Sequence, residues 1–457
     1  MGLKYMILVL FLCFVSIFGD RILSKEEDLE LEQELQRLTK PAVETIQTTY
    51  GDTYDYVDFY RQPAFDDPLM KNHSFHPQMK PISYHGGRKS KNFTSYFRPE
   101  KIWMNGKGCP VGTVPIKKIT KHDLFRAKLA SEIYASNLNP QTTERPGVHF
   151  AVLHTPRLGA KVKYYGAGMH NKVCNPKLNH DSQYSSSQLK LQNGYESIIF
   201  GWTVHPRVFG DSKTHFFIYT YANNKHCFND HCGLFIKTRP DISLDWAYDP
   251  VSPTCGPLVR SQELLVQKDE ASGNWVLKLT HGEILGMWPS RFFTGLASFA
   301  TYVEWGGEVY SPSHIASPEM GTGISPAQNG NCCGLCLNLK LVNEDKKIVH
   351  AMSLVKYEDV NKYYQVEDRG YTGENVGHVM AYGSKGGYIG NYHQCTTKKL
   401  NVVSADEIVE DDIEEHVVEM SEDVKEEDVS GTEQMLLYIN ALDGGTRDNT
   451  FNLKGIL

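Results

Sequence analysis

The feature that most constrains the fold is a succession of short apolar runs, separated by turn-forming residues, from about residue 145 to 395. Examples are VHFAVLH, THFFIYTYA, NWVLKLT and LCLNLKLV, all rich in aromatic and β-branched side chains that favour strands. No long stretch of helical periodicity separates these runs. Many short strands at close spacing predict an all-β domain, either an antiparallel sandwich or a barrel.

The region before this domain, residues 20–140, predicts little regular structure. Ser24 and Glu27 fit a capping box, and leucines then follow at helical spacing as far as Leu38. A short amphipathic helix is therefore expected there. From about 45 to 140 the chain is rich in Pro, Gly, His and Lys and weakly periodic, so we expect an irregular segment that needs another surface to fold on.

The N-terminus predicts a secretory signal peptide over residues 1–19. Lys4 precedes an apolar run from Tyr5 to Phe18, which is short for a membrane span. The alternative is a buried or anchoring helix. Two N-glycosylation sequons, at Asn72 and Asn92, fit a secreted, extracellular protein of the cell wall or a vacuolar route, with no membrane contact after the signal is removed.

The C-terminal tail, residues 396–457, is strongly acidic. Residues 406–428 contain thirteen acidic residues and one lysine, a charge of −12, whereas the whole chain carries −7, so the remainder carries +5. That balance does not indicate a nucleic-acid partner. The tail fits a flexible segment, although apolar residues at helical spacing within it also fit an acidic amphipathic helix.

The cysteines predict disulfides, because secretion exposes them to an oxidising environment. Ten are present, and nine remain after Cys13 leaves with the signal peptide, so at least one has no intramolecular partner unless its segment is removed. The stretch HCFNDHC does not match the common zinc spacings, so we expect a Cys227–Cys232 disulfide. We also expect structural disulfides at the C-x-x-C of Cys333 and Cys336. No metal or cofactor is expected.

The stretch TYVEWGGEVY places Glu304 and Glu308 on one face of a predicted strand. Four residues along a strand correspond to roughly 13 Å, too far for the two carboxylates to act as an acid–base pair. Either they are an exposed residue and an ion-paired one, or a catalytic carboxylate finds its partner on another strand.

Several stretches, in this order and at this spacing, resemble the plant neprosin family of secreted glutamic peptidases, which cleave after proline. They are DFYRQPAFDDPLMKN (58–72), GCPVGTVPIKK (108–118), GWTVHP (201–206), GDSKTHFFIYT (210–220), CFNDHCGLFIKT (227–238), SGNWVLKL (272–279), GMWPSRFF (286–293) and VEWGGEVY (303–310). The resemblance implies a propeptide that covers the active site and is removed, ahead of an antiparallel β-sandwich. It also implies a pair of catalytic glutamates.

The resemblance assigns one catalytic glutamate to Glu308. The other lies in a family stretch like S-I-E-A-G-W, which here reads SIIFGW and places Ile199 at the glutamate position. Glu196 is three residues earlier, an odd offset that points it to the other face of a strand. Tyr56 stands where the family commonly has a cysteine, which leaves Cys109 as the candidate unpaired thiol.

Two functional hypotheses follow. In the first, the protein is weakly active or inactive as a peptidase and binds peptides, proline-rich proteins or cell-wall material, with Trp202 and Trp305 supplying stacking contacts and the propeptide as an internal partner. In the second, it is an active acid peptidase in which Glu304 or Glu196 works beside Glu308. The variant Ile199→Glu would gain activity under the first hypothesis and change little under the second.

Overall fold

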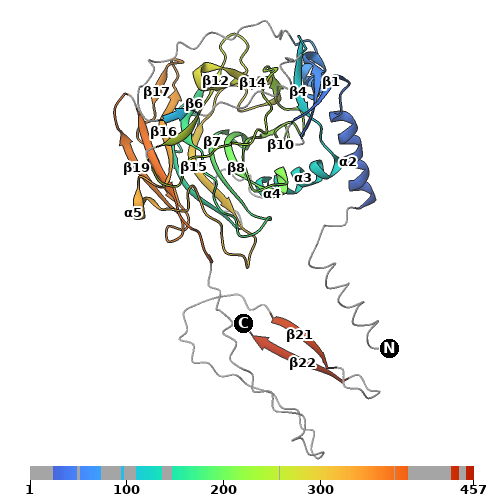
Figure 1. Cartoon of the computed structure of the whole chain (residues 1–457), viewed down its shortest axis with the longest axis vertical. Coiled ribbons are helices and arrows are strands. Elements are labelled where there is room, and N and C mark those ends of the chain that lie inside the picture. Colours follow the sequence, from blue (N-terminus) through green and yellow to red (C-terminus); the bar gives the residue numbers. More distant parts are fainter. Residues whose placement is uncertain are drawn as a thin grey trace, which may run out of the picture. The chain divides into compact units, whose positions relative to one another are not determined.

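The computed structural model (Figure 1) divides into two compact units, residues 1–392 and 393–457, which are described separately. The residues that the structure describes are 24–48, 52–73, 94–96, 110–135, 147–256, 258–374, 376–389, 434–441 and 449–456. The predicted signal peptide, Cys109, Cys395, Asn92 and the acidic run 406–428 lie outside these residues.

The first unit contains a β-sandwich of two large sheets. The seven-stranded sheet has the spatial order β10 (Lys225–Phe228), β9 (Thr214–Ala222), β8 (Glu196–Val204), β7 (Tyr184–Asn193), β15 (Tyr302–Tyr310), β5 (Val148–His154) and β18 (Val355–Glu358). All of its neighbouring strands run antiparallel. The predicted all-β antiparallel sandwich is therefore confirmed.

The ten-stranded sheet packs against the first. Its main path is β11 (Ile236–Lys237), β14 (Ile284–Trp288), β13 (Trp275–Leu279), β12 (Val259–Lys268), β6 (Gly166–Lys172), β16 (Gly334–Val342), β20 (His378–Gly383) and β19 (Gln365–Tyr371), with β17 (Ile348–His350) beside β16 and β3 (Thr94–Tyr96) beside β12. The short helices of the sandwich are η4 (Gly159–Lys161), α4 (Pro206–Phe209), η5 (Thr280–Gly282), η6 (Ser290–Phe292) and α5 (Pro326–Asn329).

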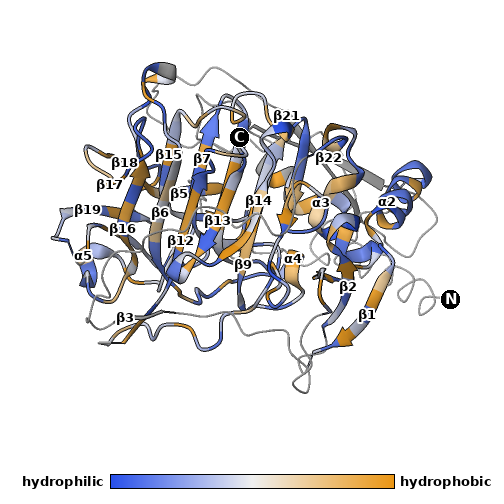
Figure 2. Ribbon diagram, turned by 90° about the horizontal axis from the view of Figure 1, so that it is seen from above, coloured by the Kyte–Doolittle hydropathy of each residue, from blue (hydrophilic) through white to orange (hydrophobic). Residues whose placement is uncertain are grey.

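The core lies between the two sheets and follows the two-residue period of the strands. In β8, for example, Ile198, Phe200 and Trp202 join a cluster with residues of β12, β13 and β14, so they face the opposite sheet. Figure 2 shows hydrophobic and hydrophilic residues alternating along many of the strands. Alternate residues of the seven-stranded sheet therefore point to its outer face, away from the ten-stranded sheet.

The N-terminal region forms a small layer of its own. It contains α2 (Lys25–Leu38), β1 (Ala42–Gln47), β2 (Thr53–Asp58), η1 (Phe59–Arg61), η2 (Pro63–Asp66), η3 (Pro68–Met70), β4 (Thr113–Lys117) and α3 (Lys121–Ala135), with a three-stranded sheet in the order β1-β2-β4. Helix α2 begins with the predicted capping box, in which Ser24 and Glu27 bond to each other's backbone amides. Leucines of α2 pack against Leu124 of α3.

Polar contacts help to join the N-terminal layer to the sandwich. Lys117 of β4 forms an ion pair of 2.7 Å with Asp245, and Tyr54 of β2 donates to the same carboxylate at 3.1 Å. Gln62 exchanges two hydrogen bonds with the backbone of Lys237. Apolar residues of η1, η2, η3 and β4 also join the core cluster of the sandwich, and α3 packs on β8 and β9, so polar and apolar contacts together hold the layer in place.

Two disulfides are present among the described residues, Cys227–Cys232 and Cys255–Cys332. Cys333 and Cys336 are buried free thiols, so the prediction of disulfides at this C-x-x-C is wrong. Cys336 belongs to the core cluster between the sheets, and burial raises its pKa to about 12, which leaves the thiol protonated and unreactive.

The second unit contains the antiparallel pair β21 (Gln434–Ala441) and β22 (Asn449–Ile456).

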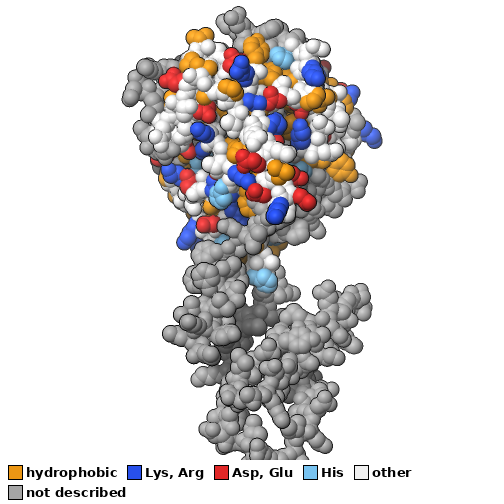
Figure 3. Space-filling view, turned by 90° about the vertical axis from the view of Figure 1, so that its right-hand side faces the viewer, with side chains coloured by type: hydrophobic (Ala, Val, Ile, Leu, Met, Phe, Trp, Pro, Cys, Tyr) orange, Lys and Arg blue, Asp and Glu red, His pale blue; other side chains and the backbone are white. Residues whose placement is uncertain are grey.

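Among the described residues no helix combines the length and apolar character needed to cross a bilayer. On the face of the molecule in Figure 3, acidic and basic side chains are interspersed.

Candidate functional site on the outer face of the seven-stranded sheet

Glu308 lies near the middle of the outer face of the seven-stranded sheet and is 1% exposed. The Tyr184 hydroxyl donates to its Oε1 at 2.5 Å, and the Gln188 amide donates to its Oε2 at 2.7 Å. Both donors come from β7, the neighbouring strand, where they alternate with core residues. A buried carboxylate that accepts two such bonds is held in one orientation, as a group that must act on a bound molecule needs to be.

The residues directly opposite Glu308 are not carboxylates. On β5 its partner in the ladder is Phe150, and on β7 it is Ser186. Side chains in such positions have Cβ atoms roughly 5 Å apart. Position 150 is therefore the place from which a second carboxylate would reach Glu308, and it holds an aromatic ring.

Ile199 is not in that place. It pairs with Lys190 on β7, whereas Glu308 pairs with Ser186, so the two positions are offset by four residues along the sheet and separated by two strand spacings. These offsets correspond to roughly 16 Å between Cα atoms. The expectation that Ile199 occupies the partner position of Glu308 is wrong, because the register places it level with Glu304.

The two alternative carboxylates are also engaged elsewhere. Glu304 shares the outer face, lies opposite His154 and Lys190, and accepts a hydrogen bond of 2.5 Å from the Tyr302 hydroxyl. Glu196 accepts from the backbone amides of Thr294 and Leu296 at 2.7 and 2.9 Å, so it anchors the loop after η6. Neither carboxylate contacts Glu308.

Trp202 and Trp305 do not line this face, so their prediction as stacking residues is wrong. Both are fully buried between the sheets, where their indole nitrogens donate to backbone oxygens of Lys172 and Gly168 on β6. Each is three residues from an outer-face position, 199 or 308, and an odd offset reverses the face of a strand.

Helix α3 covers part of the outer face. Ala130, which is 0% exposed, forms an apolar cluster with Ile199, Phe217 and other residues of β8 and β9. Ile133, one turn further, packs against that cluster and against the one that contains Phe150. The apolar character of Ile199 and Phe150 is therefore used in packing against α3.

The sequence interpretation did not identify His205, which lies immediately after β8. Its ring stacks on Tyr184 at 5.0 Å between centroids, and neither ring nitrogen has a hydrogen-bond partner among the described residues. Burial lowers its pKa to about 3, and the charge of Arg207 adds to the shift. His205 lies six residues after Ile199, and an even offset along a strand keeps the same face, so the sequence could have placed His205 on the outer face as well.

The remaining predicted positions lie away from Glu308. Cys227 and Cys232 form a disulfide that closes the loop after β10, and Asn72 is exposed after η3.

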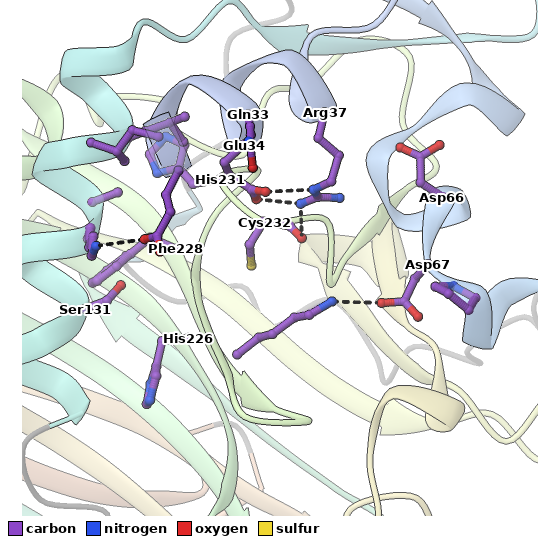
Figure 4. Close-up of a pocket in the computed structure, with 17 residues that line it drawn as sticks. Gln33, Glu34, Arg37, Asp66, Asp67, Ser131, His226, Phe228, His231 and Cys232 are labelled. Carbon is purple, nitrogen blue, oxygen red and sulfur yellow. Dashed lines mark hydrogen bonds and ion pairs between the residues drawn. The ribbon is translucent and has the colours of Figure 1, made fainter. Parts of the chain in front are cut away.

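A pocket of about 810 Å³ lies beside the loop of Cys232, between α2, η3, α3 and β10 (Figure 4). In this pocket Arg37 binds both Glu34 and the Cys232 carbonyl. The pocket is part of the contact between the N-terminal layer and the sandwich. In the described part of the chain, no group of three or more His, Cys, Asp or Glu residues is placed to hold a metal ion.

Comparisons with solved structures return low-similarity matches. Scytalido-glutamic peptidase bound to a peptide-based transition-state analogue matches with 10% identity and a TM-score of 0.29, over 52% of this chain and 98% of that one. SCP-B, a member of the eqolisin family of peptidases in complex with the tripeptide Ala-Ile-His, matches with 9% identity and a TM-score of 0.26, over 52% and 98%. The fold assignment rests on the sheet topology rather than on these values.

Comparison with protein families is more direct. The model of the neprosin activation peptide matches residues 45–154, which include β2, β4 and α3, and the neprosin model matches residues 181–385, which include Glu308. Together the two matches span well over half of the chain. The protein therefore belongs to the neprosin family, with an activation-peptide region ahead of a peptidase-like neprosin domain.

Proposed function

We propose that this protein is a secreted peptide-binding member of the neprosin family whose peptidase activity is weak or absent. The single observation behind this proposal is the ladder position of Phe150 directly opposite Glu308. Hydrolysis by two carboxylates needs one to activate water and a second, protonated one to donate to the substrate. Glu308 has no second carboxylate at either position that faces it.

The ligand in this proposal is a peptide or a proline-rich protein, bound along the outer face after the activation-peptide region has left. The apolar cluster of Ile199, Phe217 and Tyr219 would then offer contact surface to the ligand in place of α3. We further propose that a signal peptide over residues 1–19 directs the chain to the extracellular space and that Asn72 carries a glycan.

The contacts of Glu308 favour a second candidate, an active acid peptidase. Tyr184 and Gln188 hold its carboxylate in place, and a neutral amide such as that of Gln188 can donate to a developing oxyanion. In this alternative Glu308 works with neutral partners, and no second carboxylate is required.

The experiment compares the secreted full chain with Phe150→Glu, Ile199→Glu and Glu308→Gln. Each is incubated with a proline-containing peptide between about pH 3 and pH 7, the span that brackets a carboxylate pair. We expect little cleavage by wild type and a gain in Phe150→Glu that is absent in Ile199→Glu, because only position 150 faces Glu308. Cleavage by wild type that is abolished in Glu308→Gln would establish the second candidate instead.

A further inference from the structure

A group of charged side chains outside the immediate contacts of Glu308 surrounds Tyr302 at the start of β15. The guanidinium of Arg157 lies 4.4 Å from the centroid of the Tyr302 ring, and the ammonium of Lys190 lies 5.9 Å from the same centroid. The ring of His154 is 5.3 Å away. Three basic side chains from two segments, β5 with the loop that follows it and β7, therefore converge on one aromatic ring.

This group also contains one carboxylate. Glu304 accepts a hydrogen bond from the Tyr302 hydroxyl and lies between His154 and Lys190 in the ladder. Arg157, Lys190 and Glu304 together carry two positive charges and one negative charge. The hydroxyl of Tyr302 donates to Glu304, Arg157 also forms a hydrogen bond with this tyrosine, and both cations lie near its ring.

The group is in line with the candidate site. One cross-strand row, formed by Gly306, Gln188 and Gly201, separates the row of Glu308 from the row of Glu304 and Lys190. Within β15, β7 and β8, two of the three residues in that row carry no side chain, and Val152 and Phe217 continue the row on the strands to either side. A peptide backbone that runs along the strands can therefore approach the sheet where it crosses this row. Such a backbone would pass over Glu308 at one end and reach the cations at the other.

We propose that Tyr302, Arg157 and Lys190 form a subsite for a carboxylate of the bound peptide, either an acidic side chain or the free C-terminus. Arginine and lysine on an aromatic surface are suited to a carboxylate, which accepts the planar fork of one and the point charge of the other. Positions 304 and 308 are separated by roughly 13 Å of strand, so the carboxylate would be three or four extended residues from the one over Glu308. This subsite rests on the proposed peptide-binding function.

The test measures the affinity of the full secreted chain for labelled peptides by fluorescence polarisation, before and after incubation in acid to release α3. The peptides differ only in one group: Glu against Gln at the fourth residue, and a free against an amidated C-terminus. We expect at least one carboxylate peptide to bind about 10-fold more tightly than its neutral counterpart, the gain typical of a charged hydrogen bond. Which pair shows the difference identifies the source of the carboxylate.

The double variant Arg157→Gln, Lys190→Gln should bind both members of that pair with equal affinity. Lys161→Gln is the matched control, since this exposed lysine follows Arg157 by four residues and should leave the preference intact. Equal binding of both peptides by wild type, or a preference that survives the double variant, would overturn the subsite and leave peptide binding itself standing. Binding of no peptide at all would remove the proposed function together with the subsite.

Discussion

The ion pair between Lys117 and Asp245 allows a quantitative prediction about how the activation-peptide region is retained. Lys117→Met keeps the apolar stem of the side chain but removes the ammonium that lies 2.7 Å from the carboxylate. Asp245, with 10% of its side chain exposed, then keeps the hydrogen bond from Tyr54 to the N-terminal layer but loses the adjacent positive charge. The change therefore leaves a nearly buried charge with less compensation.

The magnitude follows from the exposure of the lysine. A hydrogen bond between charged groups contributes about 1.5–3 kcal/mol, and the lower end applies here because solvent screens the 29% of Lys117 that is exposed. A loss of about 1.5 kcal/mol corresponds to a roughly 10-fold larger opening equilibrium for the N-terminal layer.

Amide hydrogen exchange of the full chain at neutral pH measures this opening directly. Backbone amides of β2 and β4 should exchange about 10-fold faster in Lys117→Met, whereas amides of the sandwich core keep their rates. Lys118→Met is the control, because this neighbouring lysine is exposed and forms no ion pair among the described residues. Unchanged exchange in β2 and β4, or the same acceleration in the control, would refute the assignment of the ion pair as a retaining contact.

The same pair predicts a dependence on pH. Burial alone would raise the pKa of Asp245, but the adjacent Lys117 ammonium outweighs it and holds the pKa well below its usual range. Because the folded pKa lies below the unfolded one, the contribution is complete above about pH 4 and is lost as the pH falls toward the folded value. The difference between wild type and Lys117→Met should therefore shrink in strong acid.

Three further predictions concern other sites. His205→Phe should raise the free energy of unfolding by roughly 2–3 kcal/mol near pH 4.5 and leave it nearly unchanged at pH 7.5. The reason is that a folded pKa of about 3 makes the wild type lose stability as the pH falls below about 6.5. The same difference in unfolding free energy between variant and wild type at both pH values would contradict this. Trp202→Phe should lower the melting temperature, at a cost of about 2 kcal/mol for the orphaned Lys172 carbonyl and lost packing, without changing the affinity for peptides. Asn72→Gln should reduce the apparent mass of the secreted protein by one glycan, and deglycosidase treatment should remove the difference. Equal masses of the untreated variant and wild type would exclude a glycan at this site.

The fold could be predicted from local patterns because each of them acts over a few residues. The capping box of Ser24 and Glu27 and the two-residue period of the strands are both local, and both appear in the structure as expected. The same period, applied to Trp202 and Trp305, would have placed them in the core. That error came from neglecting the face of the strand.

The residue opposite Glu308 could not be predicted from a local pattern, because it depends on how two distant strands pair. Phe150 and Glu308 are paired through the register between β5 and β15, which lie far apart in the sequence. A strand's own residues do not specify which residue of a distant strand will lie opposite, because a register shift of two residues preserves the same faces. Motif similarity directed attention to Ile199, whereas the ladder identifies position 150.

The tryptophans that bridge the two sheets make the protein's intrinsic fluorescence a selective probe. Trp202 and Trp305 donate to β6, and Trp288 donates to the Thr220 hydroxyl on β9, so three indoles are fully buried and bonded across the sandwich. Their emission should be blue-shifted and should respond when the sheets separate. In a Trp103→Phe variant, which removes the indole of the activation-peptide region, departure of that region or arrival of a ligand at the outer face would leave these indoles in place, so the signal distinguishes global unfolding from events at the site.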